Sequence, residues 1–170
     1  MRSLLLVFTI FSFIISSPAF AKFVVGKVDI QRILLSVSEG KRVRDQLKKK
    51  FEEKQKVLKK EEKAIRKEQE NFEKRKNLLS DKKKNEGGQK IQEKILKLQQ
   101  KSVQYQKEMQ GMENKLKKPI LEKLKVVIDQ VSKKSGVDIT FEVSTAPVVY
   151  AKVSKDLTND VIKAYDSKHK

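Results

Sequence analysis

The stretch between Gly40 and Gly87 constrains the fold of this chain more than any other part of its sequence. It contains neither proline nor glycine and is rich in Lys, Glu, Gln and Leu, all of which favour helices. A helix from about Lys41 to Leu79 would be roughly 60 Å long at 1.5 Å per residue. Since a compact domain of this size has no room for such a helix, the sequence predicts that it projects from the rest of the protein.

This predicted helix carries one apolar residue in every seven positions. The residues are Phe51, Leu58, Ile65, Phe72 and Leu79. One apolar residue per heptad makes a thin stripe, because the alternate positions of the seam, the strip that faces a partner helix, are polar. Those positions are Lys54 or Gln55, Glu61 or Glu62, Glu68 or Gln69, and Arg75 or Lys76.

A second long helix follows the polar stretch Ser80–Lys90, in which the lysines and the Gly87–Gly88 pair predict a turn. Its seam positions are spaced alternately by four and three residues, the pattern of a coiled coil. They are Ile91, Ile95, Leu98, Ser102, Tyr105, Met109, Met112 and Leu116. Two such helices joined by a turn predict an antiparallel coiled-coil hairpin over residues 41–118, with its tip near 80–90 and a left-handed supercoil.

The chain before the hairpin predicts one strand and one short helix. Phe23–Val28 is rich in β-branched and aromatic residues, and Asp29 is a suitable N-cap for a helix over Ile30–Leu35. The sequence Ser38-Glu39-Gly40 is expected to interrupt the chain before the long helix begins.

After the hairpin, Pro119 predicts a kink, with helical periodicity resuming beyond it and Gly136 acting as the C-terminal cap. Residues 137–143 alternate between apolar and polar side chains, which predicts a half-buried strand. Its apolar face holds Val137, Ile139, Phe141 and Val143. A second strand is predicted over Val148–Lys152, followed by a short C-terminal helix whose apolar side holds Val161, Ile162 and Tyr165.

The two ends of the chain, residues 22–40 and 119–170, are therefore predicted to fold together into one body. Both ends contain β-type segments, which must meet to make a sheet. The predicted fold class is α+β, with a long antiparallel coiled-coil hairpin projecting from a small β-rich body. A body of this size is marginally stable with such a lever attached, and exposed strand edges favour pairing between copies. We expect self-association, although the composition does not set the copy number.

Residues 1–21 have the features of a secretory signal peptide. Arg2 is followed by a mostly apolar run, Leu4–Ile15, which is too short to span a bilayer core of about 30 Å. Ala19-Phe20-Ala21 has small residues at the spacing read by a signal peptidase, so cleavage is predicted after Ala21. A buried N-terminal helix is the alternative. The absence of cysteine excludes a lipid anchor on this residue type.

The predicted mature chain is strongly basic. Without Arg2, 39 of the 40 basic residues remain against 22 acidic ones, a net charge of +17. Residues 41–118 hold 27 basic and 13 acidic residues, so the hairpin carries +14 of this charge. Part of the charge serves to solvate the helices through Glu–Lys pairs. An excess of this size costs self-repulsion and indicates acidic partners.

Three kinds of acidic partner fit the charge. Nucleic acid is disfavoured by export and by the lack of a recognition motif. Anionic lipid or lipopolysaccharide headgroups would meet the basic tip, Lys82, Lys83 and Lys84. An unfolded polypeptide with net negative charge would also meet the apolar stripe, where Phe51, Leu58, Ile65 and Phe72 could make many weak contacts. Alternatively, these residues only close the hairpin against its other arm.

The sequence lacks the residues of common catalytic and metal sites. It has no cysteine, and its only histidine is His169, so Cys/His dyads, Ser/His/Asp triads and the usual zinc sites are excluded. No glycine-rich phosphate loop follows a strand. The chain is therefore predicted not to be an enzyme and to need no metal, cofactor or ATP.

The motifs at the two ends resemble those of the Skp/OmpH-like family of periplasmic chaperones. The first motif runs over Val25–Leu34 and Ser38–Lys41, and the second over Val148–Ala151 and Asp156–Ala164. With the signal peptide and the lysine-rich hairpin, the resemblance covers the whole predicted mature chain. Lys152 departs from the acidic residue expected after the second strand.

The resemblance implies a homotrimer whose hairpin arms surround a cavity that holds unfolded outer-membrane proteins without ATP. It places Val24, Val28, Ile139 and Phe141 in the trimeric body and the hairpin around the client. The arm residues expected near the client are Phe51, Leu58, Ile65, Phe72, Leu79, Tyr105, Met109 and Met112. The rival interpretation is a structural envelope protein that uses the hairpin as a rod to dock a folded partner or anionic lipid.

Overall fold

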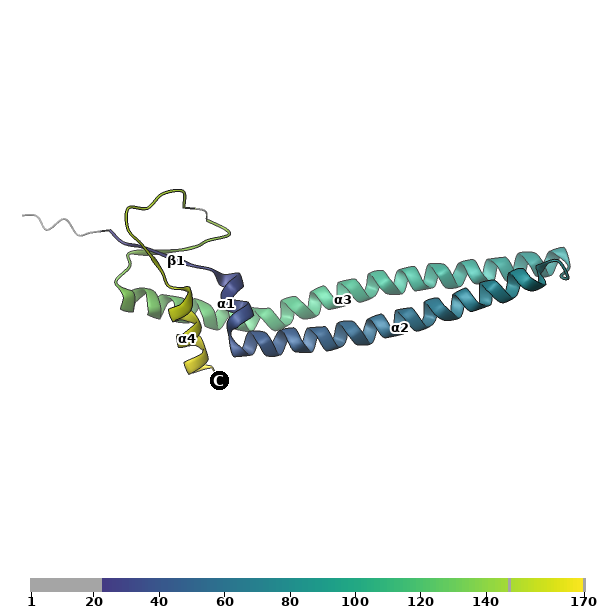
Figure 1. Cartoon of the computed structure of the whole chain (residues 1–170), viewed down its shortest axis with the longest axis horizontal. Coiled ribbons are helices and arrows are strands. Elements are labelled where there is room, and N and C mark those ends of the chain that lie inside the picture. The colour runs from purple at the N-terminus through teal and green to yellow at the C-terminus, as the bar shows by residue number, and fades with distance from the viewer. Residues whose placement is uncertain (1–22, 147, 170) are drawn as a thin grey trace, which may run out of the picture.

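The computed structural model describes residues 23–146 and 148–169, so the predicted signal peptide lies outside the described residues. A small body carries a long pair of helices that project from one side (Figure 1). In chain order the elements are β1 Val25–Val28, α1 Ile30–Ser36, α2 Ser38–Lys76, α3 Asp81–Ser135, β2 Ile139–Glu142, β3 Ser154–Asp156 and α4 Thr158–Lys168.

The arm is a hairpin of α2 and α3, which lie side by side in opposite directions (Figure 1). The predicted interruption at Ser38-Glu39-Gly40 is wrong, because these residues form the first turn of α2. Only Val37 separates α1 from α2. The free backbone N–H of Ser38 donates to Asp166 of α4 at 2.9 Å, so a side chain distant in sequence caps the helix.

Gly40 lies where two helices almost touch. A Cβ atom at this position would be 1.8 Å from the carbonyl oxygen of Leu34 and 3.2 Å from Cγ2 of Val37. Any side chain would therefore overlap the backbone of α1. The sharp joint between α1 and α2 depends on the missing side chain of Gly40.

The turn at the tip is shorter than predicted and lies earlier in the chain. Residues 77–80 connect the two helices, and Gly87 and Gly88 lie inside α3 rather than in a turn. A Cβ atom on Gly87 would be 2.4 Å from the ring of Phe72, whereas one on Gly88 would meet nothing within 4 Å. Gly87 thus makes room for an aromatic ring from the opposite arm.

Helix α3 continues through Pro119 and joins the arm to the body without a break. Pro119 is on the exposed side of the helix, where water can bond the carbonyl group that loses its partner. The helix ends as predicted, because Gly136 adopts the left-handed conformation with φ 60° and ψ 44°. The predicted N-cap of α1 is also confirmed, since Asp29 Oδ1 accepts from the backbone N–H of Arg32 at 2.8 Å.

The two ends of the chain meet in a sheet, as predicted, and this sheet is parallel with the order β2-β1-β3. Val25 pairs with Ile139 on one side and with Ser154 on the other. The predicted strand over Val148–Lys152 is wrong, because the third strand is the polar segment Ser154–Asp156. The register follows from Leu157, which is 2 % exposed and whose N–H donates to the carbonyl of Lys27 at 2.9 Å.

The core of the body is largely helical, so the body is less β-rich than predicted. Its strands have four, four and three residues. Most core side chains come from α1, the end of α3, and α4. The buried cluster comprises Val28, Ile33, Val37, Ile120, Leu124, Val127, Val131, Leu157, Val161 and Tyr165.

Candidate functional site

A groove between the two arm helices brings together four of the eight apolar residues predicted to contact a client. Phe51 and Leu58 of α2 and Tyr105 and Met109 of α3 line a hollow of about 400 Å³. Phe51 is 53 % exposed and stands at its edge, whereas the other three are half-buried. These side chains therefore pack the hairpin only in part and leave apolar surface open to solvent.

The other four predicted residues do not line this groove. Ile65, Phe72, Leu79 and Met112 are half-buried at different heights of the arm. Phe72 lies with Gly87 and Ile91 around a second hollow of about 370 Å³ nearer the tip. The predicted residues thus form a discontinuous strip along the hairpin.

The polar positions of the α2 seam form a ladder of ion pairs with α3. Lys54 pairs with Glu108 at 2.5 Å, Glu61 with Lys101, and Glu68 with Lys94 at 2.5 Å. The steps are seven residues apart on both helices, so the pairs set the register of the hairpin. Each half-exposed pair contributes at most about 1 kcal/mol, which makes this seam weaker than an apolar one.

Lys54 makes a second contact that binds it to the groove. Its Nζ lies 3.9 Å from the centroid of the Tyr105 ring, a cation–π geometry. The hydrogen bond from Lys54, followed by that from Gln104, holds the pKa of Glu108 below its usual value. The positive charge of Lys54 is thus satisfied inside the hairpin.

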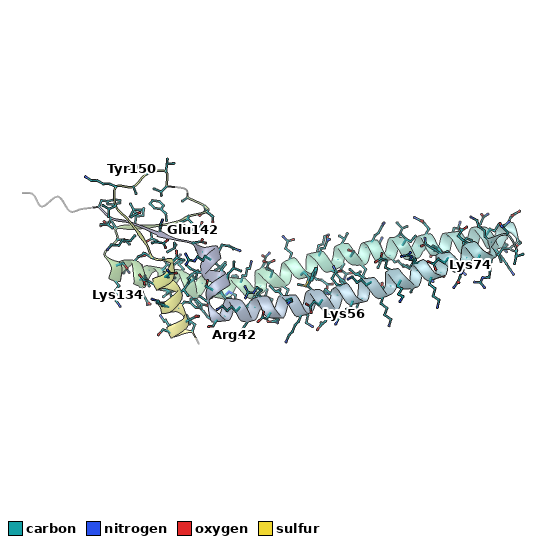
Figure 2. The ribbon with its side chains drawn as sticks, viewed as in Figure 1. Arg42, Lys56, Lys74, Lys134, Glu142 and Tyr150 are labelled. Atoms are coloured by element: carbon teal, nitrogen blue, oxygen red, sulfur yellow. The ribbon has the colours of Figure 1, made fainter. Side chains whose placement is uncertain are left out.

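The three cross-arm pairs consume equal numbers of acidic and basic groups, so the +14 excess of the arm is carried by other side chains. Lys56 and Lys74 extend from the side of α2 that faces away from α3 (Figure 2). At the tip, Lys82 and Lys83 are exposed, while Lys84 is half-buried and pairs with Asp81 at 3.2 Å. Two of the three lysines predicted at the basic tip are therefore exposed, and the third lies closer to the helix pair.

A second apolar strip, which the sequence patterns did not predict, lies on the outside of α3. Leu96 is 47 % exposed and Val103 is 51 % exposed, and both line a shallow hollow of about 450 Å³ together with Gln99, Gln100 and Gln104. They are seven residues apart, and each directly follows a seam position of α3. This repeat is the sequence signal that could have predicted the strip.

The outer face of the small sheet is turned away from the core of the protomer. It is apolar at Val25, Ile139 and Phe141 and polar at Lys27, Ser154 and Asp156. Thr140 faces α3, because its Oγ1 lies 2.7 Å from Ser132 Oγ, so its neighbours Ile139 and Phe141 point to the opposite face. Ile139 is 40 % exposed, Phe141 and Val24 are half-buried, and Tyr150 projects from the adjoining loop (Figure 2). Val28, by contrast, is buried in the core of its own protomer.

A polar network joins the root of the arm to α4. Lys123 donates to Glu39 at 2.8 Å, and the Tyr165 hydroxyl donates to the same carboxylate at 2.6 Å. Burial acts to raise the pKa of Glu39, but the hydrogen bonds from Lys123 and Tyr165 outweigh it and hold this pKa below its usual value. Burial and the neighbouring Glu39 raise the pKa of Tyr165, which stays protonated.

This network predicts a loss of stability in acid. The pKa of Glu39 is lower in the folded protein than in the unfolded chain, so its contribution is complete above about pH 4.5 and disappears as the pH falls through the folded-state value. We expect Tyr165→Phe, which lacks the hydroxyl donor, to show a shallower fall of melting temperature than the wild type between pH 6 and 3. Thermal unfolding followed by circular dichroism measures both curves, and parallel curves would contradict this role of Glu39.

Within the described ranges, no helix is both long and apolar enough to cross a membrane. The same part of the chain brings no three His, Cys, Asp or Glu side chains into an arrangement that could hold a metal ion. Its hollows are instead lined by apolar, amide and charged side chains of both signs. This surface chemistry suits the binding of a macromolecule through many weak contacts.

Taken together, the architecture defines a class of protein in which a charged helical hairpin is mounted on a small α+β body. The family described as outer membrane protein (OmpH-like) matches residues 24–165, and the chain belongs to this family. A proposed OmpH-like outer membrane chaperone from Caulobacter crescentus CB15, solved by crystallography, has the same fold with a TM-score of 0.69. The two chains are 21 % identical, over 89 % of this chain and 88 % of the other. No curated protein gives a significant match.

Proposed function

We propose that this protein is an ATP-independent periplasmic holdase, which binds unfolded outer-membrane proteins and prevents their aggregation before membrane insertion. Membership of the OmpH-like family supports a role as a chaperone of outer-membrane proteins. The single observation that carries the mechanism is the arm itself, which combines an excess charge of +14 with half-exposed apolar grooves.

The two features of the arm have separate roles in this mechanism. The positive charge attracts an acidic client, over a range that salt limits to about 8 Å at physiological ionic strength. The apolar grooves then hold the client through several weak contacts without a unique pose. Release of the client needs no ATP, because insertion of the client into the membrane lowers its free energy.

We further propose that three copies assemble through their bodies, so that the arms surround a cavity. The apolar part of the outer face of the sheet, at Ile139 and Phe141, supports this assembly because burying it would remove apolar surface from water. The edge strands β2 and β3 each keep one side free of partners among the described residues. Export with cleavage after Ala21 places the protein in the periplasm.

The rival function is a docking rod for one folded partner or for anionic lipid, with lipopolysaccharide headgroups meeting Lys82 and Lys83. A dilution assay with several unrelated outer-membrane β-barrel proteins, transferred from urea into buffer without ATP, separates the two. A holdase lowers the light scattering of all of them, and a docking rod changes none.

The role of the apolar arm residues is tested by the triple variant Phe51→Ser, Phe72→Ser and Met112→Ser. We expect it to suppress aggregation less well than the wild type, although its charge is unchanged. Equal suppression by both proteins would show that charge alone holds the client.

A further inference from the structure

The groove at Phe51 exists because one seam position of α3 is too small to fill it. Ser102 stands between Leu98 and Tyr105, whose large side chains occupy the neighbouring seam positions. On α2, Gln55 and Leu58 line the same hollow, and Lys54 is held further along it by its ion pair with Glu108. The seam is therefore left unfilled at Ser102, and the hollow of about 400 Å³ opens there.

The lining of this groove suits an aromatic side chain. Phe51 and Tyr105 offer two rings against which a third can stack or pack edge to face. Met109 adds a polarisable thioether, which makes favourable contacts with rings and adapts to ligands of different shape. Gln55, Gln106 and Gln110 complete the lining with amides, which can hydrogen-bond to the backbone of an extended chain.

The groove is electrically balanced, although the arm around it is strongly positive. Lys54 is neutralised by Glu108 at 2.5 Å, and Glu113, the remaining charged residue of the lining, pairs with Lys117 at 2.5 Å. An acidic side chain would gain little here and would lose its hydration. A neutral ring matches both the charge and the apolar character of the site.

We propose that the groove around Ser102 binds an aromatic side chain of the unfolded client. This inference rests on the proposed holdase function and adds the chemical group that the arm recognises. Transmembrane β-barrels carry girdles of aromatic residues at both membrane interfaces, so unfolded outer-membrane proteins present such groups in many places. The volume lies within the range of about 300–1,000 Å³ common for binding pockets, with room for one ring and part of its backbone.

Two variants of Ser102 separate binding from folding. Ser102→Leu fills the seam with an apolar side chain, so we expect the hairpin to melt at a higher temperature while the groove closes. Ser102→Ala leaves the groove open and serves as the matched control. The probes are two uncharged extended peptides of equal length, one with Phe and Tyr at alternate positions and one with Leu in their place.

Methionine methyl NMR reports directly on the site, because Met109 lines the groove and Met112 does not. In the full chain, with signals assigned by single Met→Leu variants, we expect the aromatic peptide to shift the Met109 methyl signal strongly upfield and the Met112 signal little. The leucine peptide should shift neither signal in this way. Ser102→Leu should abolish the shift and weaken peptide binding on the order of tenfold, whereas Ser102→Ala should preserve both.

The outcomes distinguish this inference from the proposed function. If the wild type suppresses aggregation but the aromatic peptide leaves Met109 unchanged, the holdase function stands and the groove assignment is overturned. Equal shifts with both peptides would overturn the assignment to aromatic groups. A Met109 shift that grows with protein concentration alone would assign the groove to a second copy of the chain. Failure of the wild type to suppress aggregation would overturn the proposed function itself.

Discussion

Gly40→Ala is expected to detach the arm from its body and to destabilise the protein by about 3 kcal/mol or more. The added methyl group would lie 1.8 Å from the Leu34 carbonyl oxygen, a backbone atom that cannot move without shifting α1. Because α1 contributes the fully buried Ile33 to the core, the displacement would spread through the body. Chemical denaturation followed by circular dichroism measures the loss.

Gly111→Ala is the matched control for this prediction. Gly111 also lies inside a long helix, but a Cβ atom there would meet nothing within 4 Å. Since alanine favours helix over glycine by about 1 kcal/mol, this variant should be slightly more stable than the wild type. If Gly40→Ala behaved like Gly111→Ala, the close contact between α1 and α2 would not exist in solution.

Leu124→Ala is expected to cost about 2–5 kcal/mol, because it removes a buried side chain and leaves a cavity. Leu124 is 1 % exposed and lies in the cluster where the end of α3 meets α1 and α4. This cluster anchors the arm, so the variant should also lose client binding at temperatures where the wild type is folded. The free energy of unfolding and the aggregation assay together measure the effect.

Leu121→Ala is the matched control for Leu124→Ala, because it makes the same substitution on the same helix, α3. Leu121 is 41 % exposed in the protomer, so its replacement should cost much less than that of Leu124 while changing helix propensity equally. Equal losses for the two variants would contradict the assignment of the core to this side of α3.

The arm, the N-cap of α1 and the C-cap of α3 could be predicted because their sequence signals are local. A stretch free of proline and glycine, with apolar residues at helical spacing, favours helix wherever it stands. Asp29 and Gly136 act on backbone groups within a few residues of themselves, so their roles as caps also follow from the sequence. The meeting of the two chain ends followed from their shared need for a sheet.

Other features depended on contacts between distant residues and were predicted wrongly or not at all. The start of α2 at Ser38 needs the side chain of Asp166, which lies 128 residues further along the chain. The sequence predicts a turn at Gly87, but this residue lies inside α3, where its missing side chain makes room for the ring of Phe72. The strand Ser154–Asp156 has no β-type composition and forms because the burial of Leu157 sets its pairing with β1.

The same division holds for the candidate site. The projection of a long positive hairpin with a thin apolar stripe from a small body follows from sequence patterns, because helical period and charge are properties of consecutive residues. Packing between elements sets the contacts of Lys54, Glu61 and Glu68 with α3, and it also opens the groove at Ser102 and turns Ile139 away from the core. These contacts depend on how two helices and a sheet pack against each other. Packing brings together side chains that are far apart in the sequence, so a local sequence pattern cannot predict them.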